Sequence, residues 1–486
     1  MKPTPKIYRW LDSTSGLLLL AMIVFTPWAC GTTTTLPIWT MNTGGFLLGA
    51  FWIGKCLYRR LNQYSPGWIE GSLGSVWPIR WAGAGTIFLL AYVLVSTLNP
   101  SSEIQYTYDL DYAVPTGIKF THFWNPILWL PHSFDGPRTL RAFWKYLAMT
   151  LSFWAARDWL LTCSRNERKN KLEGTLKFPT DRIQVLLWTL SINTAALSLE
   201  GILQRLDHTQ LLLWYFPNHE NGGEGAFGPF SYQSNGAQYL NLIWPVMLGF
   251  WWVQRGRNLE MRGPSTKAGG ESHVILPILI GLVAAGVFLT RSKIGFALMA
   301  GMLAVGFLIL WFSSQHQRST KFLLIGTFGG LVALGGWLGG DALRDRFLGA
   351  DYETWSGRKE TYQHARQMQS DFQVFGSGAE TFMPLYYMYH DDSSGWSAYA
   401  HDDFMETRIT LGWIGFGTVV SIFAAICCGV LAGRGIGMRR EFLLLFGLAM
   451  SGLMAHSAFD LPFQIYAIHF QFLILCALAT CFRWQR

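Results

Sequence analysis

The segment Ile409–Leu431, with the sequence ITLGWIGFGTVVSIFAAICCGVL, decides the fold of this chain. It contains no Asp, Glu, Lys or Arg, and it is long enough to cross the apolar core of a bilayer as an α-helix, which takes roughly 20 residues. A group of polar and titratable residues, His401–Glu406 (HDDFME), stands shortly before it. The sequence therefore predicts a membrane-spanning helix with ionisable side chains gathered at its first end.

Apolar segments of similar length recur along the whole chain. Half of the 486 residues are apolar, only 14% are charged, and the mean hydropathy is +0.22. Because the bilayer core offers no hydrogen-bond partners to the backbone, such segments cross it as helices. We therefore predict an all-α, polytopic membrane protein with about twelve transmembrane helices, forming a single membrane domain over residues 1–486. The predicted spans lie near residues 15–31, 39–58, 81–98, 141–163, 183–203, 233–254, 274–290, 294–312, 322–339, 409–433, 441–456 and 464–482.

Lys and Arg residues predict how the chain is oriented. They collect in every second loop, for example at Arg59-Arg60 and Arg439-Arg440. Short basic loops stay on the cytoplasmic side of a membrane. We therefore expect both termini in the cytoplasm, and the loops before residues 141, 233 and 409 on the outer side. The net charge of +8 follows from this bias, so it does not indicate a nucleic-acid partner.

Motifs of cofactor and nucleotide chemistry are missing from the sequence. The seven cysteines are scattered and form no CxxC pair, which argues against a disulfide framework and a zinc site. The chain also has no P-loop, GxGxxG element or EF-hand loop. We therefore expect no cofactor and no zinc site, no nucleotide hydrolysis by this chain, and a substrate that reaches the protein already activated.

Two of the outer loops, 99–140 and 340–408, are too long to be simple connectors. Residues 340–408 carry histidine, arginine and acidic residues interleaved with tyrosine and tryptophan, and the pattern of 357–372 predicts a helix followed by a turn at Phe375–Gly378. Long loops in compact proteins are usually functional or disordered. Aromatic faces stack on sugar rings while hydroxyls and acids bind the ring edges. We therefore predict that 340–408 is a large, partly helical outer loop suited to sugars.

Few charged residues fall within the predicted spans, and most of those lie near span ends. Lys55 and Arg157 are close to inner ends, so we expect their side chains to extend to the membrane surface. Asp460, at the outer end of the span 441–456, is not explained in this way.

Three residues are predicted to meet at the outer surface: Arg291 in the turn Thr290–Lys293, Arg358 in the long loop, and His401. Arginine presents a planar, always charged fork that binds phosphate oxygens in pairs, and imidazole takes up a proton near neutral pH. Together they suit a diphosphate leaving group and a hydroxyl nucleophile. Each has a simpler interpretation on its own. Arg291 is then an interfacial anchor, Arg358 a surface charge or an ion pair with Glu360, and His401 an exposed loop residue.

The spacing from His401 to two glycines is similar to a family signature. His401-Asp402, nine residues and then Gly412-Trp413-Ile414-Gly415 resemble the motif His-[Asn/Ser/Gln]-x9-Gly-x-x-[Gly/Thr/Tyr] of the O-antigen ligase and Wzy polymerase superfamily. Further segments resemble the family's motifs in the same order: Gly201–Gln204, Phe230–Tyr239, Thr290–Gly295, Ser356–Arg358, Phe375–Phe382 and His456–Asp460. The resemblance covers residues 180–465. Asp402 replaces the usual amide, and Lys293 stands where glycine is frequent.

The resemblance implies a GT-C-like, metal-independent glycosyltransferase of the bacterial inner membrane, with its active site on the periplasmic side. Its partners would be a polyprenyl-diphosphate-linked glycan donor, membrane lipid, and a hydroxyl acceptor on a glycan, a lipid A core or a protein. Arg291 and Arg358 would bind the diphosphate, and His401 would activate the hydroxyl. The further substrate-binding candidates are Gln204, Lys293, Asp402 and Asp460.

Two of these candidates have expected roles that follow from their position. Asp402 would orient the imidazole of His401 or raise its pKa, because it is a neighbouring negative charge. Lys293 would add a contact to the phosphates.

A secondary transporter or a lipid-linked glycan flippase is the alternative function, because twelve spans with both termini inside is also a common transporter plan. A transporter predicts ionisable residues deep in the bundle and two symmetric halves. Here the polar residues gather in one outer loop and at span ends, and no repeat is visible. Within the preferred class, the sequence does not distinguish a ligase from a polymerase.

Overall fold

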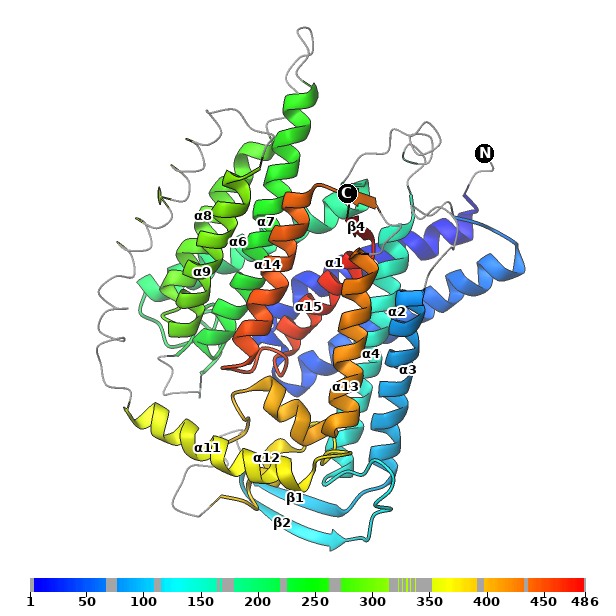
Figure 1. Cartoon of the computed structure of the whole chain (residues 1–486), viewed down its shortest axis with the longest axis vertical. Coiled ribbons are helices and arrows are strands. Elements are labelled where there is room, and N and C mark those ends of the chain that lie inside the picture. Colours follow the sequence, from blue (N-terminus) through cyan, green and yellow to red (C-terminus); the bar gives the residue numbers. More distant parts are fainter. Residues whose placement is uncertain are drawn as a thin grey trace.

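The computed structural model describes residues 4–66, 77–108, 115–163, 167, 179–218, 225–261, 272–313, 322, 326, 329, 330, 333, 337, 352–390, 397–431 and 436–484. Within these ranges the chain consists mainly of long helices packed side by side (Figure 1). Every predicted span except 322–339 overlaps one of these helices. Most of 322–339 lies outside the described residues.

The helices that overlap the predicted spans begin or end several residues away from the predicted bounds in some cases. They are α1 (Lys6–Trp28), α2 (Thr35–Leu61), α3 (Trp77–Leu98), α4 (Gly136–Leu161), α6 (Asp181–Leu206), α7 (Gln233–Met261), α8 (Ser272–Leu289), α9 (Lys293–Trp311), α13 (Asp403–Leu431), α14 (Arg440–Ser457) and α15 (Tyr466–Ala479). Five of the described helices, α1, α3, α6, α9 and α13, are long and apolar enough to cross a membrane by themselves. The chain is therefore a helical membrane protein.

The helices and strands of the two long loops, 99–140 and 340–408, lie at the end of the bundle opposite to both termini (Figure 1). Here α11 (Tyr352–Asp371) and α12 (Phe382–Tyr386) form the helical part of the long loop, close to the strands β1 (Ser102–Tyr108) and β2 (Pro115–Phe123). The predicted outer loops thus gather at one end of the molecule.

The antiparallel hairpin of β1 and β2 corrects the all-α prediction, as does a short parallel pair of β3 (Ile436–Met438) and β4 (Phe482–Trp484). In β1 (SEIQYTY), Ile and Tyr alternate with polar residues, which is the pattern of a strand. The turn helix η1 (Cys30–Thr32) completes the described elements.

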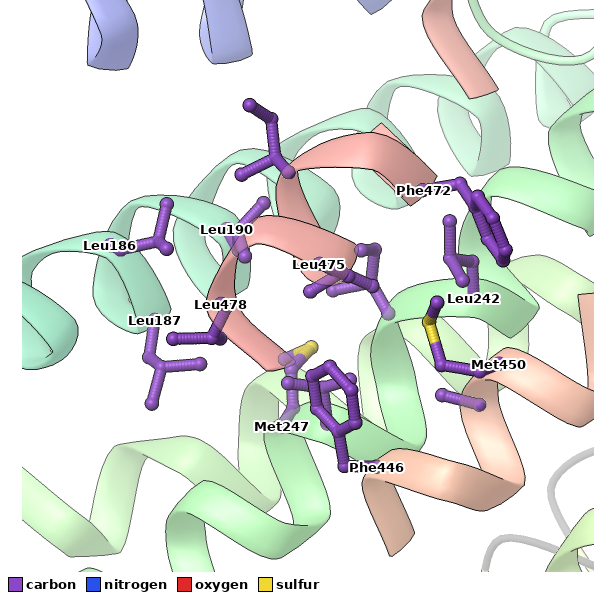
Figure 2. Packing of buried hydrophobic residues seen from close by; sticks show 14 of the residues in the cluster. Leu186, Leu187, Leu190, Leu242, Met247, Phe446, Met450, Phe472, Leu475 and Leu478 are labelled. Atoms are coloured by element: carbon purple, nitrogen blue, oxygen red, sulfur yellow. The ribbon is translucent and has the colours of Figure 1, made fainter. Parts of the chain in front are cut away.

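Large apolar side chains fill the space between α6, α7, α14 and α15 (Figure 2). Leu187 of α6, Met247 of α7, Phe446 of α14 and Leu478 of α15 are all buried there. Because lipid tails are as apolar as leucine, close packing rather than escape from water holds such helices together. At the contact of α2 with α4, a Cβ added to Gly45 would lie 2.6 Å from the Ala148 carbonyl oxygen, so only glycine allows this approach.

A buried network of ion pairs joins α1, α2, α4 and α6. The fully buried Lys55 Nζ lies 2.7 Å from Asp158 Oδ2 and 3.3 Å from Asp12 Oδ1. Arg59 pairs with Asp158 at 2.6 Å, and Arg182 pairs with Asp12 at 2.5 Å. The prediction that Lys55 extends to the membrane surface is therefore wrong. Two carboxylates from other helices compensate its charge inside the bundle.

Candidate active site

His401 stands directly before α13, in a backbone conformation that is uncommon for residues other than glycine. Its φ is 52°. Asp402 Oδ1 accepts a hydrogen bond of 2.9 Å from Met405 N–H, so Asp402 caps the first turn of α13. The hydroxyl of Tyr362, on α11, donates to the carbonyl oxygen of His401 at 3.2 Å. The strained residue is thus held from both sides, as is usual at functional positions.

The imidazole of His401 faces a buried carboxylate on the connection between α14 and α15. Its Nδ1 lies 3.4 Å from Asp460 Oδ1, while 29% of the His401 side chain is exposed to solvent. A proton on Nδ1 that points at Asp460 leaves the lone pair on Nε2, the nitrogen that can then accept a proton. The carboxylate therefore occupies the orienting position that the sequence suggested for Asp402.

Asp460 stays ionised in this surrounding. Burial raises the pKa of its carboxyl group, but the hydrogen bond from His401 lowers it, as do the nearby His456 and Arg358. The lowering effects prevail, so the pKa of Asp460 lies below its usual range. His456 is buried at the end of α14, with its Nε2 4.0 Å from Asp460 Oδ2.

Arg358 lies one turn before Tyr362 on α11 and points toward the same connection. Its Nη1 donates to the carbonyl oxygen of Phe459 at 3.4 Å, and its Nη2 donates to the hydroxyl of Tyr232 at 3.5 Å. Both contacts are long and both acceptors are neutral. Because Phe459 and Asp460 are consecutive, Arg358 and His401 are held by adjacent residues.

The turn between α8 and α9 places Arg291 at its tip, exposed and with a φ of 59°. Ser292 caps α9 by accepting a 3.1 Å hydrogen bond from Gly295 N–H, and its hydroxyl lies 3.1 Å from that of Ser234. Ser234 lies two residues after Tyr232, and Tyr232 contacts Arg358. The entry to α7 therefore connects the Arg358 region with the Arg291 turn. Lys293 begins α9 in this turn.

Gln204, near the end of α6, forms hydrogen bonds with the backbone of the loop that follows this helix. Its side chain is 1% exposed. Its Oε1 accepts from Gly228 N–H at 2.6 Å, and its Nε2 donates to the Leu211 carbonyl oxygen at 2.8 Å. Both ends of the amide are therefore used to hold the loop between α6 and α7.

The glycine spacing of the family signature has a geometric reason. Gly412 breaks α13 with a φ of 63° and a ψ of −175°, and Gly376 has a φ of 73°. Around these two residues, Trp413 N–H donates to the Gln373 carbonyl oxygen at 2.8 Å, and Gly378 N–H donates to that of Thr410 at 2.9 Å. The segment after α11 therefore docks into the break in α13, which ties the helix that carries Arg358 to the helix that follows His401.

Sequence reasoning missed Tyr232 and Tyr362 as neighbours of the site. Tyr362 is four residues after Arg358, so helical periodicity puts both on one face of α11, and this signal was present in the sequence. Tyr232 has no comparable local signal. Among the described residues, no group of three or more His, Cys, Asp or Glu is placed to hold a metal ion.

Residues 278–420 match the family model described as O-antigen ligase. This segment includes Arg291, Lys293, Arg358, His401 and Asp402, whereas Gln204 and Asp460 lie outside it. No curated protein matches the chain. The match confirms the resemblance that rests on the His401 motif: residues 278–420 of this chain are similar to the O-antigen ligase family.

Proposed function

We propose that the protein transfers a glycan from a polyprenyl-diphosphate carrier to an acceptor hydroxyl at the periplasmic face of the inner membrane. The family match supports glycan transfer of the ligase or polymerase type. The observation that supports the mechanism best is the pairing of the partly exposed His401 imidazole with the buried Asp460 carboxylate, next to Arg358.

His401 acts as the general base in this proposal. Its Nε2 takes the proton from the acceptor hydroxyl while the oxygen attacks the anomeric carbon of the donor glycan. The bond between that carbon and the diphosphate breaks, and the polyprenyl diphosphate leaves with the electron pair. Asp460 positions the imidazole and stabilises the imidazolium that forms. Asp402 contributes by fixing the start of α13 rather than through the imidazole.

The two arginines bind the diphosphate. The two hydrogen bonds that Arg358 makes to Phe459 and Tyr232 are long and go to neutral oxygens, whereas phosphate oxygens are stronger acceptors that match the guanidinium fork. Arg291 presents a second guanidinium at the exposed tip of a short, capped turn, and Lys293 adds a positive charge there. Charge that develops on the diphosphate as the glycosidic bond breaks is then stabilised in place.

The membrane arrangement fits this reaction. The elements that carry His401, Arg358 and Asp460 lie at the end of the bundle away from both termini (Figure 1). With the termini in the cytoplasm, as the basic loops predict, the site opens to the periplasm and the spans accommodate the polyprenyl chain.

An assay with purified protein, lipid-diphosphate glycan and acceptor tests the proposal. We expect His401→Gln to lose most turnover and the matched variant His122→Gln, on the exposed hairpin, to keep it. Full turnover of His401→Gln would refute the base assignment. Unchanged activity of both Arg291→Ala and Arg358→Ala would refute the diphosphate site. A chelator is expected to leave the rate unchanged. Lipid-linked glycan flux in proteoliposomes without any glycosidic product would instead support the flippase alternative.

A further inference from the structure

The loop between β2 and α4 exposes large apolar side chains at its tip. In this segment, the 123–130 loop, Leu128 is 75% exposed and Trp129 is 74% exposed. The other exposed apolar residues of the loop are Phe123, Trp124 and Ile127. A continuous group of this kind marks an interaction site rather than an ordinary soluble surface.

Backbone groups on both sides of the tip are paired within the protein, most of them by the side chain of Asn99. Asn99 Nδ2 donates to the carbonyl oxygens of Ile127, at 3.0 Å, and of Pro131, at 3.2 Å. Asn99 Oδ1 accepts from Ile127 N–H at 2.8 Å, and Leu130 N–H donates to the Ile127 carbonyl oxygen at 3.1 Å. The pairing lowers the cost of moving Ile127, Leu130 and Pro131 into a less polar phase, because these backbone groups do not need water as a partner.

The base of the loop is fixed to the rest of the protein. Ser96 of α3 donates to the His132 carbonyl oxygen at 2.7 Å, and Phe134 N–H donates to that of Ser377 at 2.6 Å. The hydroxyls of Ser133 and Thr139 lie 2.7 Å apart. The base of the loop is therefore held against α3 and against the segment after α11.

The tip of the 123–130 loop lies beside the end of α3, so lipid is the partner that fits its exposed apolar side chains. Asn99 directly follows Leu98, the last residue of α3, and Leu98 is itself 75% exposed. Helix α3 is a candidate membrane span, and only 22% of its most apolar stretch is buried inside the protein, so most of that stretch is accessible to lipid. Because Asn99 binds residues 127 and 131, the tip lies at the level where α3 leaves the membrane. The exposed surface of the loop thus continues the lipid-facing surface of α3.

From these observations we propose that the 123–130 loop is embedded in the interfacial region of the lipid leaflet on the hairpin side of the membrane. Leu128 and Trp129 reach toward the acyl chains, while Trp124 lies at the headgroup level that tryptophan prefers. The loop thereby anchors the start of α4, and with it Ser377 and the segment after α11. This inference stands independently of the proposed glycan transfer.

Photo-crosslinking in the full-length protein tests the placement. A benzophenone amino acid is introduced in place of Leu128, and in a matched control in place of Thr121, an exposed polar residue of β2. After illumination in native membranes, the Leu128 protein is expected to gain the mass of a phospholipid, and the Thr121 protein is not. A crosslink from position 128 to another protein, or to a second copy of this chain, would overturn the proposal.

A fluorescence measurement tests the same placement without relying on the reactivity of the crosslinker. A bimane label at Leu128→Cys, in a cysteine-free background in nanodiscs, should lose emission with brominated phosphatidylcholine and resist quenching by iodide. The label at Thr121→Cys should behave in the opposite way. Equal quenching of both labels by iodide would show that the loop is in water and would refute the proposal.

Discussion

Replacement of Gly412 by alanine tests whether the break in α13 is required by the docked segment. The backbone of Gly412, with φ 63° and ψ −175°, occupies a region that is essentially restricted to glycine. A Cβ at this position would lie 2.3 Å from the Val374 carbonyl oxygen and 2.5 Å from Gly376 N. Both neighbours are backbone atoms, so neither can move aside as a flexible side chain would.

The magnitude follows from two costs. The strained φ and ψ cost about 1–3 kcal/mol. Forcing a methyl group against closely packed backbone costs about another 1–3 kcal/mol. We therefore expect Gly412→Ala to lower the free energy of unfolding by about 2–6 kcal/mol. Because the same contact holds α11 against α13, transfer activity should fall as well.

The matched control is Gly417→Ala, five residues further along the same helix. A Cβ at Gly417 meets nothing within 4 Å, and alanine favours a helix over glycine by about 0.5–1 kcal/mol. Thermal unfolding of the detergent-purified proteins, followed by circular dichroism, should give a lower midpoint for Gly412→Ala only. Equal midpoints for both variants would refute the docking argument. The double variant Gly376→Ala/Gly412→Ala should cost less than the sum of the single variants, since both break one contact.

Three further outcomes are expected. Lys55→Met leaves Asp12 and Asp158 buried with one cation fewer, so it should lower the unfolding free energy by about 3–5 kcal/mol, whereas the exposed Arg60→Met should not. Asp460 has a lowered pKa in the folded protein, so its carboxylate stabilises the fold above the unfolded pKa of about 3.9 and this contribution is lost at lower pH. The difference in unfolding free energy between wild type and Asp460→Asn should therefore shrink as the pH falls below about 4; a constant difference would contradict it. Arg358→Lys should reduce turnover about 10²-fold, since an ammonium cannot bind the diphosphate oxygens in pairs as the guanidinium does; stability should change little, because the contacts of Arg358 to Phe459 and Tyr232 are long.

The positions of the helices could be predicted because hydropathy is a local property of the chain. The ion pairs of Lys55 could not, since Asp12 is 43 residues away and nothing local indicates the pairing. In the candidate site, too, local features could be predicted and contacts between distant residues could not. The spacing from His401 to Gly412 was visible in the sequence, but the residue that faces the imidazole is Asp460, 59 residues away, rather than the adjacent Asp402. An aspartate directly before a helix often accepts a hydrogen bond from a backbone N–H of the first turn, and Asp402 caps α13 in this way.

The short connection between α14 and α15 contacts both the candidate base, His401, and the candidate phosphate ligand, Arg358. Phe459 contacts Arg358, and Asp460 contacts His401. The residues shortly after them, Phe463 and Gln464, are hydrogen-bonded to α13. The buried Asp403 accepts hydrogen bonds from Phe463 N–H at 2.9 Å and from Gln464 Nε2 at 3.1 Å. A shift of this connection would therefore displace the base and the guanidinium together. Substitutions at Asp403 and Asp460 should consequently be non-additive in activity, because residues that act as one unit lose their effect together.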